Sequence, residues 1–134
     1  MSSFFEPNAH ALWLRHEVTR FFCPVCGPVG VADRNIIPDA RMTASTFYSS
    51  SYYPYYGRLN ENKVGGAWCT KTVSDRTDYL QVDMGAVKSV CAVATQGFKG
   101  GTWRTTSYKV HFSRNRVTWS TYKENNVEKV IHLQ

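Results

Sequence analysis

The segment Tyr79–Met84 alternates between apolar and polar side chains from Leu80 onward. Leu80, Val82 and Met84 are apolar, and the residues between them are polar. Because successive side chains of an extended chain point to opposite faces, this pattern predicts a strand with one face in a core. The chain must therefore build a sheet that packs on one side.

Further short runs are rich in Val, Thr and aromatic residues, which favour strands, and turn residues separate them. They are Met42–Phe47, Ser89–Thr95, Thr105–Ser113, Thr118–Tyr122 and Lys129–Leu133. No helical pattern lies between these runs, so they predict an all-β antiparallel sandwich or barrel. The 134 residues, 43% of them hydrophobic, are enough for one such domain and its core.

The N-terminal region has a different pattern. Between Ala11 and Phe22, apolar residues recur at helical spacing and predict a short amphipathic helix; they are Leu14, Val18, Phe21 and Phe22. Prolines and glycines between residues 24 and 30 end this pattern and mark a domain boundary. We therefore expect an N-terminal extension, residues 1–22, before a domain of residues 23–134. The extension either has no role in the fold or binds a membrane surface or a partner.

The N-terminus does not indicate a cellular compartment. Charged residues, among them Arg15, Glu17 and Arg20, interrupt the apolar stretch that a secretory signal peptide needs. No apolar run is long enough to span a bilayer.

The sequence carries a mild basic excess, with 16 Lys and Arg against 10 Asp and Glu and a net charge of +6. This excess favours anionic partners in general. The basic residues are spread through the chain rather than clustered, so we expect no nucleic-acid partner.

Catalytic and metal-binding motifs are missing from the sequence. No Gly-x-Ser-x-Gly motif occurs, and the 4 histidines lack the spacing of metal ligands. We therefore expect a protein that is not an enzyme and that uses no metal or cofactor.

The cysteines leave more than one interpretation open. Cys23 and Cys26 form a CxxC motif, which is found in zinc sites and redox pairs. Cys69 and Cys91 are too far apart to form a second such pair, so a disulfide framework in a small extracellular fold is the simpler interpretation.

The segment 47–57, Phe-Tyr-Ser-Ser-Ser-Tyr-Tyr-Pro-Tyr-Tyr-Gly, is the most unusual local feature. Its serines, proline and glycine predict a surface loop. Tyrosine offers a large amphipathic surface with only two side-chain torsions to immobilise. We therefore expect some of these rings to contact a ligand and others to pack over the core.

Blocks of sequence along the chain resemble the discoidin, or coagulation factor 5/8 type C, domain. In order they are Ile37–Ser45, Arg58–Asn60, Ala67–Cys69, Tyr79–Gly85, Val93–Gly97, Thr106–Val110 and Val117–Trp119. The resemblance begins at Cys23 or Cys26 and implies an eight-stranded jelly-roll β-sandwich of the galactose-binding type. It also implies an extracellular or secreted adhesion module whose loops, at one end of the sandwich, bind phospholipid membranes, proteins such as collagen, or glycans.

The resemblance places the tyrosine loop at the first binding loop of the family. The segment Phe98–Trp103 corresponds to another, and Lys71–Arg76 to a third beside them. The implied ligand-binding residues are Tyr52, Tyr53, Tyr55, Tyr56, Lys71, Arg76, Phe98, Lys99, Trp103 and Arg104. Cys69 and Cys91 both lie inside the domain and either pair in a disulfide or remain free thiols.

Two departures from the family pattern carry further expectations. The segment Ser113–Val117 replaces the Asp-Gly turn that is usual in the family, so Arg116 bears a strain if that turn needs a positive φ. The family pattern also continues beyond Gln134 through further strands, so we expect a domain that lacks its last strands, with exposed sheet edges and apolar faces. The sequence thus predicts a recognition module for an anionic phospholipid surface, a matrix protein or a glycan; the alternatives are a lectin-like module or a partial gene product without independent function.

Overall fold

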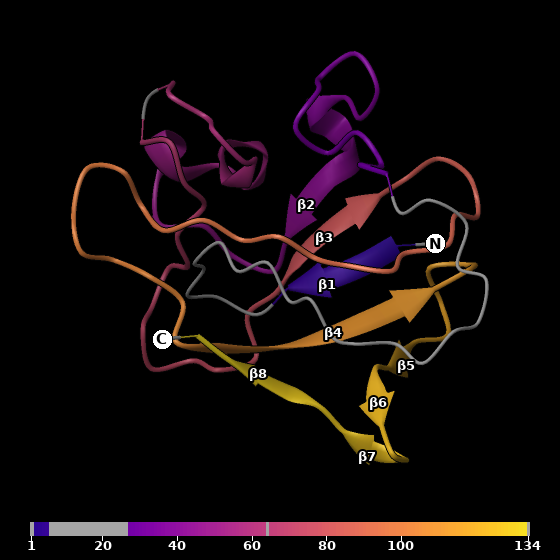
Figure 1. Ribbon diagram of the computed structural model, residues 1–134. Helices are drawn as coiled ribbons and strands as arrows, with labels where there is room; N and C mark the ends of the chain where they lie inside the picture. The colour runs from indigo at the N-terminus through magenta and orange to yellow at the C-terminus, as the bar shows by residue number, and fades with distance from the viewer. Residues whose placement is uncertain (1, 6–26, 64, 134) are drawn as a thin grey trace.

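The computed structural model describes residues 2–5, 27–63 and 65–133 (Figure 1). A six-stranded sheet runs through the molecule in the order β2-β3-β1-β4-β5, and β8 also pairs with β4. Its strands are β1 (Ser2–Phe5), β2 (Met42–Ala44), β3 (Leu80–Asp83), β4 (Ser107–Ser113), β5 (Ser120–Thr121) and β8 (Val130–His132). Every pairing in it is antiparallel. The prediction of an all-β antiparallel fold is confirmed.

A separate hairpin joins β6 (Lys123–Glu124) to β7 (Val127–Glu128). Asn125 and Asn126, the two residues of its turn, have positive φ angles of 51° and 64°. A two-residue turn of this kind matches the twist of the flanking strands, and asparagine tolerates the left-handed region. No local pattern in the sequence had predicted this hairpin.

Three short 3-10 helices connect the strands: η1 (Asp39–Arg41), η2 (Ser50–Tyr52) and η3 (Pro54–Gly57). Pro54 is the first residue of η3, where its fixed φ suits the helix and its missing N–H is not needed. The tyrosine loop is therefore two consecutive helical turns rather than irregular chain.

The core forms where β2 and β3 lie side by side. Ile37, Met42, Leu80 and Val82 are its buried residues, and Trp68 packs against them from the side. Met84 is also buried, so all three apolar positions of the alternating segment face the interior as predicted.

The strand predicted over Ser89–Thr95 is absent. Residues 84–106, all of them described, contain no strand. Val90 and Val93 are half-buried, so their apolar character serves packing. A strand also needs a neighbouring chain that accepts and donates ladder hydrogen bonds, and β-branched residues favour extension without supplying that neighbour.

Strand β1 was not expected from the sequence. It belongs to the segment that we assigned to an extension outside the domain, yet it lies in the middle of the sheet, between β3 and β4 (Figure 1). A domain boundary at residue 23 therefore leaves out one strand of the sheet. The helix expected over residues 11–22 lies outside the described residues.

The turn after β4 takes the strained conformation that we expected. Arg116 has a φ of 63°, in the left-handed region that residues other than glycine and asparagine seldom adopt. The hydroxyl of Ser113 accepts a hydrogen bond from the Arg116 backbone N–H at 2.8 Å, and the Asn115 side chain accepts one from Val117 at 2.9 Å. These side-chain acceptors hold the turn in place of an Asp-Gly pair.

Within the described ranges, no helix is both long and apolar enough to cross a membrane.

Candidate functional site

The tyrosine loop begins with a serine that caps the first helical turn. The Ser49 hydroxyl accepts a hydrogen bond from the Ser51 backbone N–H at 3.4 Å, and the Ser49 carbonyl accepts one from Tyr52 at 2.9 Å. The Tyr53 carbonyl then accepts a hydrogen bond from Tyr56 at 2.9 Å in the next turn. Tyr52 of η2 belongs to one group of aromatic rings, and Tyr55 and Tyr56 of η3 belong to another.

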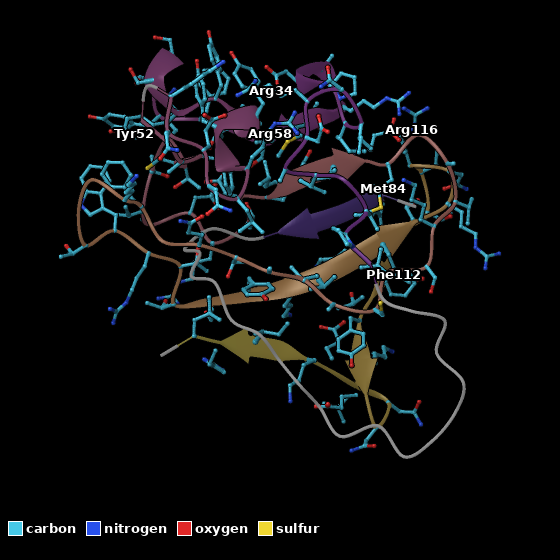
Figure 2. The ribbon with its side chains drawn as sticks, turned by 45° about the horizontal axis from the view of Figure 1, so that its top comes forward. Arg34, Tyr52, Arg58, Met84, Phe112 and Arg116 are labelled. Carbon is cyan, nitrogen blue, oxygen red and sulfur yellow. The ribbon has the colours of Figure 1, made fainter. Side chains whose placement is uncertain are left out.

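The first group, which we call the aromatic tip, consists of Tyr48, Tyr52, Phe98 and Trp103. Ring centroids are 6.0 Å apart for Tyr48 and Tyr52, 6.3 Å for Tyr52 and Phe98, and 5.8 Å for Phe98 and Trp103. Tyr48 is 63% exposed and Trp103 is 59% exposed. The tip therefore joins two loops far apart in sequence into one exposed aromatic surface, on the left of Figure 2 at the label of Tyr52.

The loop 97–104 has a backbone that places Phe98 and Trp103 together. The Phe98 N–H donates a hydrogen bond to the Trp103 carbonyl at 3.1 Å, which closes the loop. A Cβ atom on Gly100 would lie only 2.6 Å from Cζ of Phe98, so this ring position requires glycine there.

The second group, the inner tyrosine cluster, consists of Phe47, Tyr53, Tyr55 and Tyr56. Ring centroids are 4.8 Å apart for Phe47 and Tyr53, and 4.7 Å for Tyr55 and Tyr56. The three tyrosines are half-buried, and Tyr55 packs against the core. Desolvation raises the pKa of Tyr55, and the neighbouring Tyr56 acts in the same direction.

Two arginines lie next to the inner tyrosine cluster or beside its neighbours in the fold. The Arg34 guanidinium lies 5.7 Å from the centroid of the Tyr55 ring and forms ion pairs with Asp39 and Glu61. Arg58 is buried and donates hydrogen bonds to the Ile37 carbonyl at 2.7 Å and to Asp39 at 2.8 Å. This network fixes the base of the tyrosine loop on the core (Figure 2).

Four predicted cations are exposed: Lys71 and Arg76 in the loop 71–77, and Lys99 and Arg104 in the loop 97–104 that carries Phe98 and Trp103. The Lys99 ammonium donates a hydrogen bond to the amide oxygen of Asn62 at 2.9 Å, which ties the loop 97–104 to the segment that follows the tyrosine loop. None of the four cations forms an ion pair with a carboxylate of the described residues. No described carboxylate therefore neutralises their charge.

The loop 71–77 contributes an apolar residue that the sequence analysis missed. Val73 is 96% exposed, and it lies between Lys71 and Arg76 in sequence. The Asp75 carboxylate accepts a hydrogen bond from the Thr77 backbone N–H at 2.9 Å, which shapes the end of the loop. An isolated valine among turn residues was the only sign of this position. Tyr48 was also missed, because nothing local distinguishes it from the other tyrosines.

A buried carboxylate connects these loops to the sheet. Asp78, 2% exposed, accepts hydrogen bonds from the hydroxyls of Ser45 and Thr46, the latter at 2.7 Å. The Thr46 hydroxyl accepts a further hydrogen bond from the Lys71 backbone N–H at 3.1 Å, and its carbonyl accepts one from the Trp68 indole at 2.8 Å. This position gives Asp78 a structural role.

A cavity of about 1240 Å³ extends from the aromatic tip toward the core. Phe98 and Trp103 line it at the tip, and Leu80 and Val82 of β3 line it at the other side. Residues 89–99 form much of its remaining wall. The tip thus lies over an apolar volume rather than over a filled sandwich.

Of the two possibilities left open for Cys69 and Cys91, a disulfide between them is wrong, and the free thiol holds for Cys69 only. Cys69 carries a free thiol, and burial raises its pKa. Cys91 is disulfide-bonded, so the two residues do not bond to each other. Both cysteines lie inside the domain, but a sequence position does not bring two sulfur atoms within bonding distance. Within the described residues, no group of three or more His, Cys, Asp or Glu side chains could hold a metal ion.

Two kinds of known protein are among those similar to this chain. Bovine lactadherin is 35% identical over 105 residues, which is 72% of this chain and 24% of that protein. Rat lactadherin is 36% identical over 112 residues, covering 78% of this chain and 26% of that protein. The human EGF-like repeat and discoidin I-like domain-containing protein 3 is 36% identical over 104 residues, covering 72% of this chain and 21% of that protein.

The chain therefore spans about a quarter of the length of these relatives. The F5/8 type C domain matches residues 41–133, which include the strands β2 to β8, the aromatic tip and the inner tyrosine cluster. This chain belongs to the F5/8 type C, or discoidin, domain family.

Proposed function

We propose that this chain is a non-catalytic extracellular recognition module that binds an anionic phospholipid surface through its aromatic tip. The observation that carries the proposal is the combination of exposed rings, Tyr48 and Trp103, with surrounding cations that no described carboxylate neutralises. Membership of the discoidin family, whose members are adhesion and recognition modules, supports it.

The free energies that the rings and cations contribute are compatible with weak, reversible membrane binding. Half burial of one such ring, out of roughly 150–250 Å², contributes on the order of 2 kcal/mol. A basic residue near an anionic leaflet adds about 1 kcal/mol. Two rings and the cations around them then contribute on the order of 8 kcal/mol, from which the entropic cost of association must be subtracted.

The side chains at the tip suit a membrane interface better than a sugar. Trp and Tyr prefer the interfacial region of a bilayer, and the loop 71–77 adds an exposed apolar side chain, Val73. Sugar recognition needs hydrogen-bonding groups that are not already used. Two amide oxygens near the loop 97–104 are already engaged within the protein: that of Gln96 accepts a hydrogen bond from the Asn60 backbone N–H, and that of Asn62 accepts one from Lys99.

The test is sedimentation of the protein with vesicles of phosphatidylserine and phosphatidylcholine, and with vesicles of phosphatidylcholine alone, over a series of salt concentrations. We expect binding to the anionic vesicles only, weakening as salt rises, because screening reduces the attraction of the exposed cations. The Trp103→Ala and Arg104→Gln variants should both bind more weakly.

The matched control is Arg114→Gln, which removes an exposed charge in the turn next to Arg116. Figure 2 shows Arg116 at the opposite end of the molecule from Tyr52. This variant should bind as the parent protein does. Equal binding to neutral vesicles, or binding that soluble sugars compete away, would contradict the proposal, and the second result would favour a lectin.

A further inference from the structure

Three exposed arginines lie at strand ends away from the aromatic tip. Arg41 directly precedes β2, and Arg114 and Arg116 belong to the turn that follows β4. Figure 2 shows Arg116 far from Tyr52, at the other end of the molecule. We call Arg41, Arg114 and Arg116 together the arginine end.

The end of β3 connects the two segments that carry these arginines. Because β2 is antiparallel to β3, Arg41 lies beside Asp83, the last residue of β3. A Cβ atom on Gly85 would overlap the Arg41 guanidinium, so this guanidinium lies against the Gly85 backbone. The Arg116 guanidinium reaches the same strand end, with 3.2 Å between its Nη1 and Oδ2 of Asp83. Arg41 and Arg116, which are far apart in sequence, therefore flank one strand end.

The arginine end keeps an excess of positive charge. Asp83 pairs with Arg116, but neither Arg41 nor Arg114 forms an ion pair with a carboxylate of the described residues. Asp39, two residues before Arg41, is already paired with two other arginines. Among the described residues, three guanidinium groups and one paired carboxylate thus leave two positive charges in excess.

The stability of the fold does not explain an arginine at position 116. Its φ of 63° is strained for a residue with a side chain. The Arg116 side chain is 65% exposed, and an exposed ion pair contributes less to stability than this strain costs. Strained residues of this kind are concentrated at binding sites, where the strain is compensated by function. We therefore looked for a role of this guanidinium outside the fold.

The turn holds two of the arginines in a fixed arrangement. The Asn115 side chain, between Arg114 and Arg116, accepts hydrogen bonds from the backbone N–H groups of Val117 and Thr118, both at 2.9 Å. A backbone that is already fixed loses little entropy when a ligand binds. The turn therefore presents Arg114 and Arg116 ready for a ligand with several negative charges.

We propose that the arginine end binds a sulfated polysaccharide through ion pairs between its guanidinium groups and sulfate groups along the polymer. A guanidinium is planar and always charged, and it donates two parallel hydrogen bonds to the oxygens of a tetrahedral oxyanion. Sulfate presents the same tetrahedral arrangement of oxygens as phosphate. All three cations of this end are arginines, which suits paired hydrogen bonds better than the point charge of lysine does.

Other anionic partners fit this end less well. Arg41 and the segments 83–87 and 113–118 include no aromatic residue. Single-stranded nucleic acids are held by stacking of their bases on aromatic rings, and membrane interfaces favour Trp and Tyr. A sulfated polysaccharide needs neither, because its charged groups alone make it a strong anion. The proposal does not depend on the proposed function, because the arginine end shares no residue with the aromatic tip.

The experiment measures binding of the whole chain to immobilised heparin, a sulfated polysaccharide, by surface plasmon resonance over a series of salt concentrations. Hyaluronan, which carries carboxylates but no sulfates, and oligothymidylate, which carries phosphates, serve as soluble competitors. We expect heparin binding that weakens as salt rises, because ions condensed on a polyanion are released on binding. Soluble heparin should compete, and the two other polymers should compete far less.

Arg41→Gln and Arg114→Gln should each weaken heparin binding about twofold to fivefold, as expected for the loss of one exposed ion pair. Arg116→Gly should weaken heparin binding to a similar extent and at the same time raise the melting temperature. It removes the guanidinium and the backbone strain together, so affinity and stability change in opposite directions. A purely structural role of Arg116 would not produce this combination.

The matched control is Lys123→Gln, which removes an exposed positive charge from the separate β6–β7 hairpin and should bind heparin as the parent protein does. A parent protein that does not bind heparin, or arginine variants that bind it as well as the parent, would overturn the proposal. An equal loss in Lys123→Gln would mean that net charge alone acts. Equal competition by hyaluronan or oligothymidylate would rule out recognition of sulfate, and weaker binding of Arg41→Gln to anionic vesicles would assign this end to the membrane instead.

Discussion

The carboxylate of Asp78 accepts a hydrogen bond from the hydroxyl of Thr46, with 2.7 Å between the two oxygens. Asp78 lies two residues before the start of β3, and Thr46 directly precedes the tyrosine loop. One buried group therefore positions the loop relative to the sheet, and the binding loops depend on the core through it.

Replacing Asp78 with Ala should lower the free energy of unfolding by about 2 to 4 kcal/mol, because it removes a buried carboxylate that accepts hydrogen bonds from both the Ser45 and the Thr46 hydroxyls. Urea denaturation measures the change. Asp75→Ala is the control, because Asp75 is exposed and bonds only Thr77. Equal midpoints for the Asp78 variant and the parent protein would show that this carboxylate does not hold the loop.

The aromatic tip and the inner tyrosine cluster should respond differently to truncation. Trp103→Ala should weaken binding to anionic vesicles about tenfold while changing the unfolding free energy by less than about 0.5 kcal/mol, because the ring is exposed. Tyr55→Ala should cost about 2 to 3 kcal/mol of stability, because Tyr55 packs against the core and under Arg34. Vesicle sedimentation and urea denaturation of both variants provide the comparison; the reverse pattern would assign the ligand to the inner cluster.

Two neighbouring glycines provide a matched pair at the tip. A Cβ on Gly100 would lie 2.6 Å from the Phe98 ring, whereas one on Gly101 would lie 3.5 Å from it, an ordinary contact. Gly100→Ala should therefore displace Phe98 and weaken vesicle binding, and Gly101→Ala should leave it unchanged. Similar binding by the two variants would mean that the position of the Phe98 ring has no effect on the ligand.

Glu61 should make stability depend on pH. Desolvation alone would raise the pKa of Glu61, but the Lys63 backbone N–H and the Arg34 guanidinium lower it below its ordinary value. Because the folded-state pKa is lower than the unfolded one, ionised Glu61 stabilises the fold at neutral pH, and this contribution is lost as pH falls through the folded-state pKa.

The measurement for Glu61 is the urea midpoint of the parent protein and of Glu61→Gln between about pH 7 and pH 3, a range that includes the ordinary carboxyl pKa. The parent protein should be the more stable at the upper end, and the difference should shrink toward the lower end. A difference that does not change with pH would contradict the assignment.

Arg116 offers a test of backbone strain. Its φ of 63° favours glycine, so Arg116→Gly should relieve about 1 kcal/mol of strain while losing an exposed ion pair with Asp83 that is worth less than that. The same change at Arg114, which has no positive φ, should destabilise the protein by about 0.5 to 1 kcal/mol. Thermal unfolding distinguishes the two; if Arg116→Gly lowers the melting temperature as much as Arg114→Gly, the turn is not strained.

Local sequence patterns predicted secondary structure and backbone strain correctly where these depend on neighbours within one segment. The alternation around Leu80 and Val82 identified β3 and its buried face, and the turn chemistry around Arg116 identified a strained position. The same reasoning failed over Ser89–Thr95, where the composition favours a strand but no ladder forms. The sequence also left open whether Cys69 and Cys91 bond to each other, because bonding depends on where the folded chain brings the sulfur atoms.

The sequence by itself determined the all-β class, the family, the core face of β3 and the loops that carry the aromatic residues. Only the tertiary structure decided which aromatic rings form the exposed tip and which form the inner tyrosine cluster. It alone placed Val73 in solvent and β1 between β3 and β4. The physical reason is that periodicity and turn chemistry act between near neighbours in the chain, whereas burial, ring contacts and strand pairing depend on residues far apart in sequence that come together on folding.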